Sequence, residues 1–290
     1  MLSGLVWTLG LFSPGTYLTP GILEAQEEAR WLPGLRPFDP LIAAPRETQF
    51  RGSLVYADRA DGVDYEGRNI EAQVVIGHSL AILRMDSGST PGRAVTLGYE
   101  LGIFSRFFME SSQKDLINVD YRVGLPIAIR HDDWQFRITV RHVSSHIGDD
   151  YVTRFPERSI RVGDEILQRT KDGVEGLVAR SLGSGVRVYG GGDFNFHVNP
   201  GISRSTLRTG LEWNPRGRGT DDRAWPFAAV NYEVPSRSER AGTTVVAGMG
   251  AMVSGRVLRV EARANFGSSP MGQLGEGEET FFGVGIAMIP

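Results

Sequence analysis

The 290-residue sequence contains no cysteine, no excess of charge of one sign and no long hydrophobic run. The absence of cysteine excludes a disulfide scaffold, a thiol nucleophile and a cysteine-ligated zinc site. The 31 basic and 34 acidic side chains give a net charge of -3, which argues against a nucleic-acid-binding protein. No apolar stretch reaches about 20 residues, so the sequence predicts no membrane-spanning helix.

Glycine, by contrast, is abundant, with 37 residues in the chain. This is about an eighth of the residues, against roughly 7% in average proteins, and it lacks the strict period of collagen. Such an excess suits sheet bends and tight turns better than helices.

From about residue 48 onward, apolar side chains recur at every second position, and the clearest case runs from Ile117 to Arg130. Odd positions there are all apolar, whereas even positions such as Asp120 and Arg122 are polar or small. A strand with this pattern has one apolar and one polar face. The next segment repeats the pattern from Trp134 to Arg141, and only residues 131–133 separate the two, which is hairpin spacing.

Twelve such segments can be placed along the chain. They are residues 48–57, 70–85, 94–109, 116–130, 133–147, 173–182, 186–198, 203–213, 225–235, 243–253, 256–266 and 279–289. Short connectors fall at one end of the predicted sheet and the long ones around 58–69, 148–172 and 267–278 at the other, although residues 86–93 and 214–224 are longer than expected for the short end. An even strand count with this asymmetry is typical of bacterial outer-membrane barrels.

A soluble β-sandwich also alternates apolar and polar positions and is the competing fold. It accounts less well for long strands with many charges opposite the apolar face. Aromatic residues near the predicted strand ends favour a lipid-facing wall with aromatic girdles; they are Trp134, Trp213, Trp225, Phe266 and Phe281. We therefore predict an all-β fold, a transmembrane antiparallel up-and-down β-barrel of about 12 strands.

Three regions follow from this prediction. Residues 1–25 contain a short apolar core and are similar to a secretory signal peptide. Residues 26–47, rich in Pro and Glu, are expected to form a periplasmic N-terminal segment, and residues 48–290 the barrel. The expected location is the outer membrane of a Gram-negative cell, with outer-membrane lipids and the barrel-assembly machinery as partners and no nucleic acid.

Several segments resemble an uncharacterised family of bacterial proteins, a domain of unknown function whose members are presumed to be outer-membrane barrels. The resemblance rests on Phe38–Glu47, Asp115–Pro126, His142–Asp150, Tyr189–Gly192 and Ser268–Gln273. It implies a barrel in the outer membrane and transfers no activity.

The segment from His142 to Asp150 is the best candidate site, with two histidines, two serines and two acids in nine residues. By strand parity, His142, Ser144 and His146 continue the apolar row and point outward. This placement is similar to outer-membrane phospholipase A and lipid A deacylase, which carry a His-x-Ser pair outside the barrel, although those enzymes have Asn where this chain has Ser145. His142 would act as general base for Ser144. Asp150 is our choice for the group that orients the imidazole, with Asp149 and Glu157 as alternatives.

A metal site on His142 and His146 is less favoured, because on an extended strand they lie roughly 13 Å apart by rise alone. The Gly-rich stretches Tyr189–Gly192 and Gly283–Gly285 lack the spacing of nucleotide-binding loops. We therefore predict neither metal nor cofactor.

The inward faces are expected to carry most of the charge. Their charged residues are Asp120, Arg122, Arg137, Arg141, Arg187, Asp193, Arg204, Arg208, Glu212, Arg259, Glu261 and Arg263. Such residues either line a pore that selects solutes by charge or pair across the lumen and close it. Two function hypotheses result: an envelope barrel, structural or a narrow channel, without enzymatic activity, and alternatively a lipid acyl hydrolase that uses Ser144 and His142.

Overall fold

The computed structural model confirms a closed antiparallel barrel of twelve strands. It describes residues 28–33, 36–59, 69–87, 92–154, 161–162, 165–166, 169–199, 203–215, 224–237, 240–271 and 278–289. The wall strands are β2 (Phe50–Arg59), β3 (Ile70–Asp86), β4 (Arg93–Phe108), β5 (Leu116–His131), β6 (Trp134–Ile147), β9 (Arg169–Gly183), β10 (Val186–Val198), β11 (Ser205–Trp213), β12 (Trp225–Pro235), β13 (Gly242–Val253), β14 (Arg256–Gly267) and β15 (Glu279–Ile289). Each wall strand pairs with its two neighbours along the chain, and β15 pairs with β2 to close the wall.

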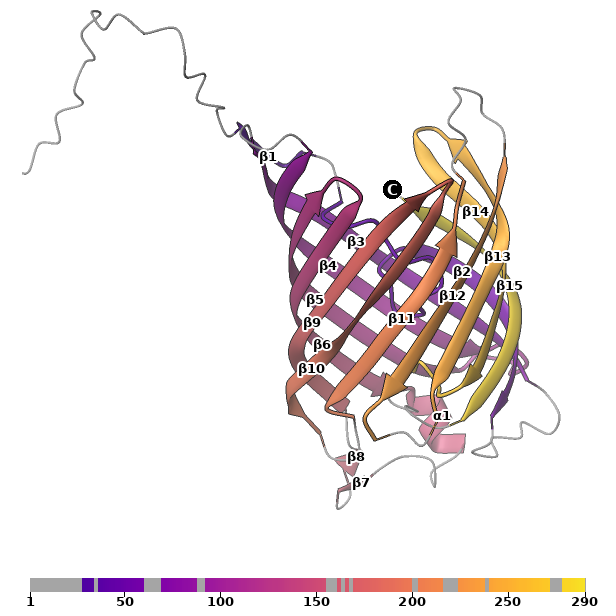
Figure 1. Cartoon of the computed structure of the whole chain (residues 1–290). Coiled ribbons are helices and arrows are strands. Elements are labelled where there is room, and N and C mark those ends of the chain that lie inside the picture. Colours follow the sequence, from indigo (N-terminus) through magenta and orange to yellow (C-terminus); the bar gives the residue numbers. More distant parts are fainter. Residues whose placement is uncertain are drawn as a thin grey trace, which may run out of the picture.

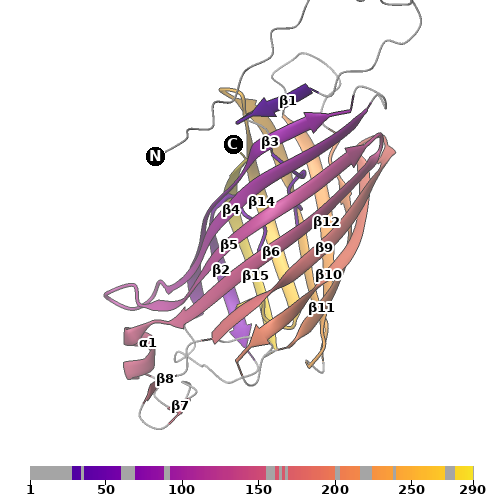
Figure 2. The same cartoon turned by 90° about the vertical axis from the view of Figure 1, so that its left-hand side faces the viewer.

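The strands are strongly tilted against the barrel axis, as Figure 1 and the perpendicular view in Figure 2 show. Four small elements accompany the wall. Strand β1 (Glu28–Trp31) extends the sheet beside the end of β3, helix α1 (Asp149–Arg154) follows β6, and β7 (Arg161–Val162) pairs with β8 (Glu165–Ile166). None of the described helices is long and apolar enough to cross a membrane.

The two ends of the barrel differ. At the end that we call the turn end, residues 132–133, 184–185 and 254–255 connect neighbouring strands. Ser184, Gly185, Ser254 and Gly255 all have positive φ angles, as tight two-residue hairpin turns require. The opposite end, the loop end, carries α1 and the longest connection, between β6 and β9, although residues 87–92 and 214–224 at the turn end also exceed a tight turn.

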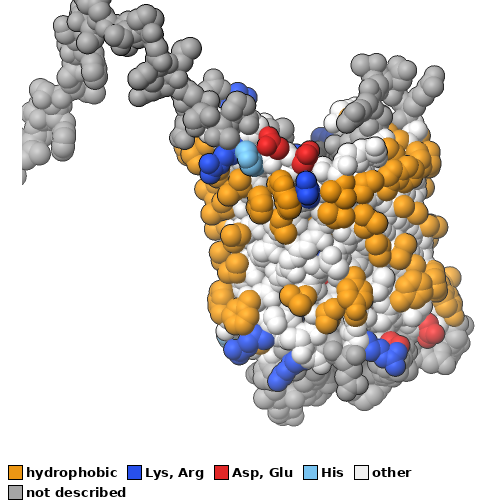
Figure 3. Space-filling model, in the orientation of Figure 1, with side chains coloured by type: hydrophobic (Ala, Val, Ile, Leu, Met, Phe, Trp, Pro, Cys, Tyr) orange, Lys and Arg blue, Asp and Glu red, His pale blue; other side chains and the backbone are white. Residues whose placement is uncertain are grey.

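The outward face is apolar across the wall. On β6 the exposed fraction alternates strictly, with Phe136, Ile138 and Val140 outside and Arg137 and Thr139 inside. Figure 3 shows apolar side chains over the visible face, with charged side chains confined to its two ends. Trp134, Trp213 and Phe266 are exposed on the outward face as expected.

Two residues of the predicted aromatic girdle face inward instead. Trp225 lies on the same face of β12 as the buried Phe227. Phe281 is the second. It is fully buried, and the Arg106 guanidinium lies 5.8 Å from its ring centroid. The neighbouring Phe282 points outward instead, because adjacent residues of a strand face opposite sides.

The inward face holds the charge, as the alternation predicts. Of the twelve charged residues expected inside, Arg204 is exposed and precedes β11, and the other eleven are buried or nearly so. Barrel parity therefore identifies the lumen-facing residues correctly wherever the residue belongs to a strand.

The described part of the N-terminal segment lies inside the barrel. From Arg36 onward the chain enters the lumen and reaches β2 from inside, and the periplasmic placement of residues 26–47 stays a prediction. Residues 38, 41–45 and 47–49 are all buried. In Figure 1 this part of the chain is the dark coil between the front and back strands. Residues 1–25, the expected signal peptide, lie outside the described residues.

Candidate functional site

The outward polar row on β6 is present as the strand parity predicts. Ser144 and His146 are half-buried and His142 is exposed, all on the outward side close to the loop end. Ser144 Oγ and His146 Nε2 lie 2.7 Å apart, within hydrogen-bond distance. The edge of the Tyr121 ring packs against His146, with 5.8 Å between ring centroids.

The predicted hydrogen bond between His142 and Ser144 is not present in the structure. The hydrogen-bond partner of His142 is Asp172 on β9, with 2.6 Å between Nδ1 and Oδ1, and that of Ser144 is His146. Asp150 lies exposed in the first turn of α1 and makes neither of these bonds. Glu157 lies outside the described residues. Asp172, which the sequence argument did not consider, is the acid that the fold places beside a histidine.

The second serine has a different role. Ser145 points inward, is buried, and donates a hydrogen bond to Asp120. Asp120 also accepts from Asn118 and pairs with Arg46. The strand part of the motif, residues 142–147, is therefore split by the wall, with its odd and even members on opposite faces. Among the described residues, no group of three or more histidines and acids could hold a metal ion.

The lumenal segment, residues 36–49, crosses the interior of the barrel. Its apolar side chains occupy small hydrophobic niches in the wall. Phe38 and Leu41 pack near Ala128, Leu177 and Tyr189, which belong to three different strands. A second niche forms where Ile42 and Ala43 meet β12 and β13. The segment thus has defined places for its largest apolar groups on two separate parts of the wall.

Charged groups of the wall hold the same segment. Arg137 pairs with Glu47 at 3.0 Å, Arg46 pairs with Asp120, and the Glu212 carboxylate accepts the Ile42 N–H at 2.6 Å. Arg187 donates to the carbonyl oxygens of both Asp39 and Pro40. Because these contacts come from β5, β6, β10 and β11, the segment is fixed from several directions.

Asp39 sits where the segment faces the turn end. Its carboxylate accepts hydrogen bonds from Arg130 at 2.9 Å and from Gln135 at 2.7 Å. Burial by itself would raise the pKa of Asp39. The positive charges of Arg130 and Arg187, together with the hydrogen bonds from Arg130 and Gln135, outweigh burial and hold the pKa below its ordinary value.

An ion-pair hub fills the lumen beside the segment. Glu175 on β9 is buried, with Arg137 at 3.0 Å and Arg122 and Arg208 each at 3.2 Å. Arg122 also pairs with Glu100. A second buried group joins Arg106 to Glu71 and Glu279. Opposite charges of nearby strands therefore pair inside the lumen, which supports a closed lumen rather than a charged open pore.

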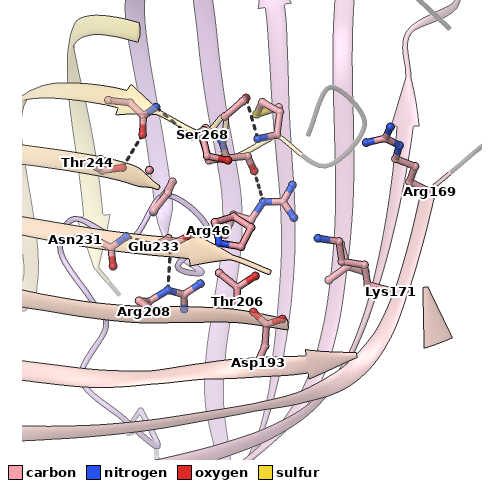
Figure 4. Close-up of a pocket in the computed structure, with 18 of the residues that line it drawn as sticks. Arg46, Arg169, Lys171, Asp193, Thr206, Arg208, Asn231, Glu233, Thr244 and Ser268 are labelled. Carbon is pink, nitrogen blue, oxygen red and sulfur yellow. Dashed lines mark hydrogen bonds and ion pairs between the residues drawn. The ribbon is translucent and has the colours of Figure 1, made fainter. Parts of the chain in front are cut away.

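One hollow lies toward each end of the barrel. The hollow near the loop end has a volume of about 70 Å³ and is shown in Figure 4, where Arg46 lies between Arg169 and Lys171 on one side and Arg208 and Glu233 on the other. The hollow near the turn end has a volume of about 360 Å³ and is lined by Asp39, Pro40 and Ile42 of the lumenal segment among others. The segment contributes to the walls of both hollows and lies between them.

Comparison with known proteins agrees with this architecture. A family model described as "Protein of unknown function (DUF1207)" matches residues 23–288. The chain belongs to this family. The matched region of this DUF1207 protein takes in the lumenal segment as well as all twelve wall strands. No curated protein matches the chain.

Two solved structures show the same fold. The outer membrane phospholipase dimer of Salmonella typhi with bound calcium has a TM-score of 0.55 and 12% identity, over 87% of this chain and 94% of that one. The outer membrane phospholipase A of Escherichia coli has a TM-score of 0.52 and 12% identity, over 87% of this chain and 93% of that one. At this identity the likeness shows a fold resembling that of outer-membrane barrels.

Proposed function

We propose that this DUF1207 protein is a structural barrel of the outer membrane, kept closed by its own lumenal segment. The apolar outward face would contact outer-membrane lipids, and the barrel-assembly machinery would insert the chain. Strand β1 and the last residues of β15 lie at the turn end, so that end would face the periplasm and the loop end the exterior. The resemblance of the fold to outer-membrane proteins supports this location.

The observation that carries the proposal is the docking of residues 36–49 in the lumen. An open diffusion channel needs a continuous water path, whereas here Leu41 and Ile42 are buried in wall niches and the charges around Glu175 are paired. The two hollows end at the segment from opposite sides. A narrow channel would require the segment to leave its niches.

Conductance in planar bilayers tests the proposal. The refolded wild-type protein should show no regular single-channel conductance steps. The double variant Leu41→Asp/Ile42→Asp should show such conductance steps, because two unpaired carboxylates in apolar niches would drive the segment out of the lumen. Leu32→Asp is the matched control, since Leu32 is 66% exposed, and it should stay silent. Regular steps from the wild-type protein would overturn the closed-barrel proposal.

A second candidate is lipid ester hydrolysis, and one observation favours it. Ser144 and His146 form a hydrogen-bonded pair on the outward face, where a lipid ester could approach, and a histidine bonded to a serine can accept its proton. It ranks second because no acid of the described chain is bonded to His146, and His142, the base that we predicted, is bonded to Asp172 instead.

Acyl release from phospholipid and lipopolysaccharide would test this second candidate. Activity should vanish in Ser144→Ala and His146→Ala if the pair is catalytic, whereas Thr153→Ala, an exposed change on α1, should leave it intact. No acyl release from the wild-type protein, with or without calcium, would remove lipid hydrolysis from consideration.

A further inference from the structure

A third, smaller cavity lies on the inner side of the wall, between the lumenal segment and strands β2, β3, β4, β5, β14 and β15. Its volume is about 30 Å³. One water molecule needs roughly 10–15 Å³ measured in this way, so the cavity holds one or two groups of that size. Pro45 and Arg46 of the lumenal segment form one side, and Arg51, Gln73 and Arg263 of the wall form another.

The wall side chains offer this cavity hydrogen-bond donors that nothing in the described chain accepts. Arg51 and Arg263 each keep Nε and Nη1 without a partner, and so does the amide nitrogen Nε2 of Gln73. These three side chains are 5%, 3% and 8% exposed. Buried donors of this kind destabilise a fold unless something accepts their hydrogen bonds.

The charges that line the cavity are also unbalanced. The guanidinium groups of Arg46, Arg51 and Arg263 face a single carboxylate, Asp120, and that carboxylate already pairs with Arg46 and accepts from Asn118 and Ser145. Glu261 bonds to Arg263 but does not line the cavity. A water molecule would accept two hydrogen bonds and leave the excess positive charge, whereas an anion accepts more and neutralises it.

We propose that this cavity is a binding site for one small monovalent inorganic anion of the size of chloride. The same two arginines also hold the lumenal segment, since Arg51 donates to the carbonyl oxygen of Pro45 and Arg263 to that of Ile42. The anion therefore links the wall to the segment and stabilises the closed barrel.

Bromide provides a direct test, because it replaces chloride and is located by anomalous scattering. Crystals of the full chain grown in bromide should show an anomalous peak between Arg51, Gln73 and Arg263. In detergent, thermal unfolding in chloride or bromide should occur at a higher temperature than in gluconate of equal ionic strength, by roughly 3 °C for each tenfold excess over the dissociation constant.

Gln73→Glu places a carboxylate where the anion would sit. This variant should lose the dependence on chloride and unfold in gluconate at the temperature of the wild-type protein in chloride. Gln113→Glu adds the same charge at an exposed position outside the cavity and should keep the chloride dependence. No anomalous peak at the cavity together with equal unfolding in chloride and gluconate would overturn the proposal and identify the occupant as water. The wild-type diffraction result decides the matter even if Gln73→Glu fails to fold.

Discussion

Single arginines organise the interior, and Arg106 is the most completely enclosed of them. Its side chain is 0% exposed and pairs with the carboxylates of Glu71 and Glu279. A buried ion-pair group of this kind stabilises the fold little more than apolar side chains of equal volume would. Removing one of its members, however, leaves an unpaired buried charge, which is strongly destabilising. The stability of the lumen should therefore depend on balance among these charges rather than on their number.

Arg106→Met should lower the free energy of unfolding by about 3–5 kcal/mol, because it leaves two buried carboxylates without their cation. The triple variant Arg106→Met/Glu71→Gln/Glu279→Gln should recover most of this loss. Urea unfolding in detergent micelles, followed by tryptophan fluorescence, measures both. A triple variant no more stable than the single one would contradict the argument from charge balance.

Asp39 predicts a response to acid at the turn end. Its pKa is lowered in the folded protein, so its contribution is present above the ordinary pKa of the carboxyl and is lost as the pH falls through the lowered value. Protection of the lumenal segment against protease should weaken as the pH falls below about 4. The effect should stay within about 1 kcal/mol, because the Asp39–Arg130 pair is partly exposed.

Asp39→Asn provides the comparison for this acid response. The variant should be less protected at neutral pH and show a flatter profile below pH ~4 than the wild-type protein. An acid-stable protease such as pepsin, applied in short pulses, measures the protection. An unchanged profile in the variant would assign the response to other carboxylates.

At the scale of strands and turns, two glycines with the same backbone conformation should differ in their tolerance of a side chain. Gly185 and Gly255 have φ angles of 79° and 77°. A Cβ at Gly185 would lie 2.5 Å from Pro215 Cα, whereas one at Gly255 has nothing within 4 Å. At both positions the positive φ angle makes any residue with a side chain unfavourable. Only at Gly185 would the added Cβ also clash with the backbone of Pro215.

Gly255→Ala should therefore destabilise the barrel by about 1–2 kcal/mol through φ alone. Gly185→Ala should cost measurably more, because residues 214–215 of the β11–β12 connection must move. Urea unfolding of the two variants in parallel measures the difference. Equal losses would show that this connection yields to the added methyl group.

Most of these elements could be predicted from the sequence because alternation is a local signal. The predicted strand 133–147 corresponds to β6 at Trp134–Ile147, and all twelve predicted strands are present. The position of the lumenal segment could not be predicted in this way. The segment is Pro-rich and has no period-two alternation, so its sequence does not indicate which surface it contacts. Only its apolar residues Leu41 and Ile42 indicate that it is not a solvated linker.

The candidate site shows the same limit. Parity placed His142, Ser144 and His146 on one face correctly, because the face depends only on residue number along the strand. Which histidine bonds Ser144 depends on side-chain rotamers and on Asp172 of the next wall strand, β9, which pattern alone does not fix.

For the whole molecule, the wall rather than the lumenal segment sets the net charge of the interior. The segment contributes two carboxylates, Asp39 and Glu47, and two arginines, Arg36 and Arg46, so its net charge is zero. Among the buried charged residues of the described wall strands, eight are arginines and seven are acids. A barrel opened by Leu41→Asp/Ile42→Asp should therefore prefer anions, as the reversal potential in a KCl gradient would show. A preference for cations would mean that the segment stays in the lumen after leaving its niches.

The position of this segment in the chain also constrains how the molecule can be assembled. Residues 36–49 immediately precede the first wall strand, and the wall closes only when the last strand, β15, meets β2. Threading a stretch with three prolines and several charges into a finished cylinder would require breaking contacts on many strands at once. The wall is therefore expected to assemble around the segment, which then acts as an internal template for the strands that follow it in synthesis.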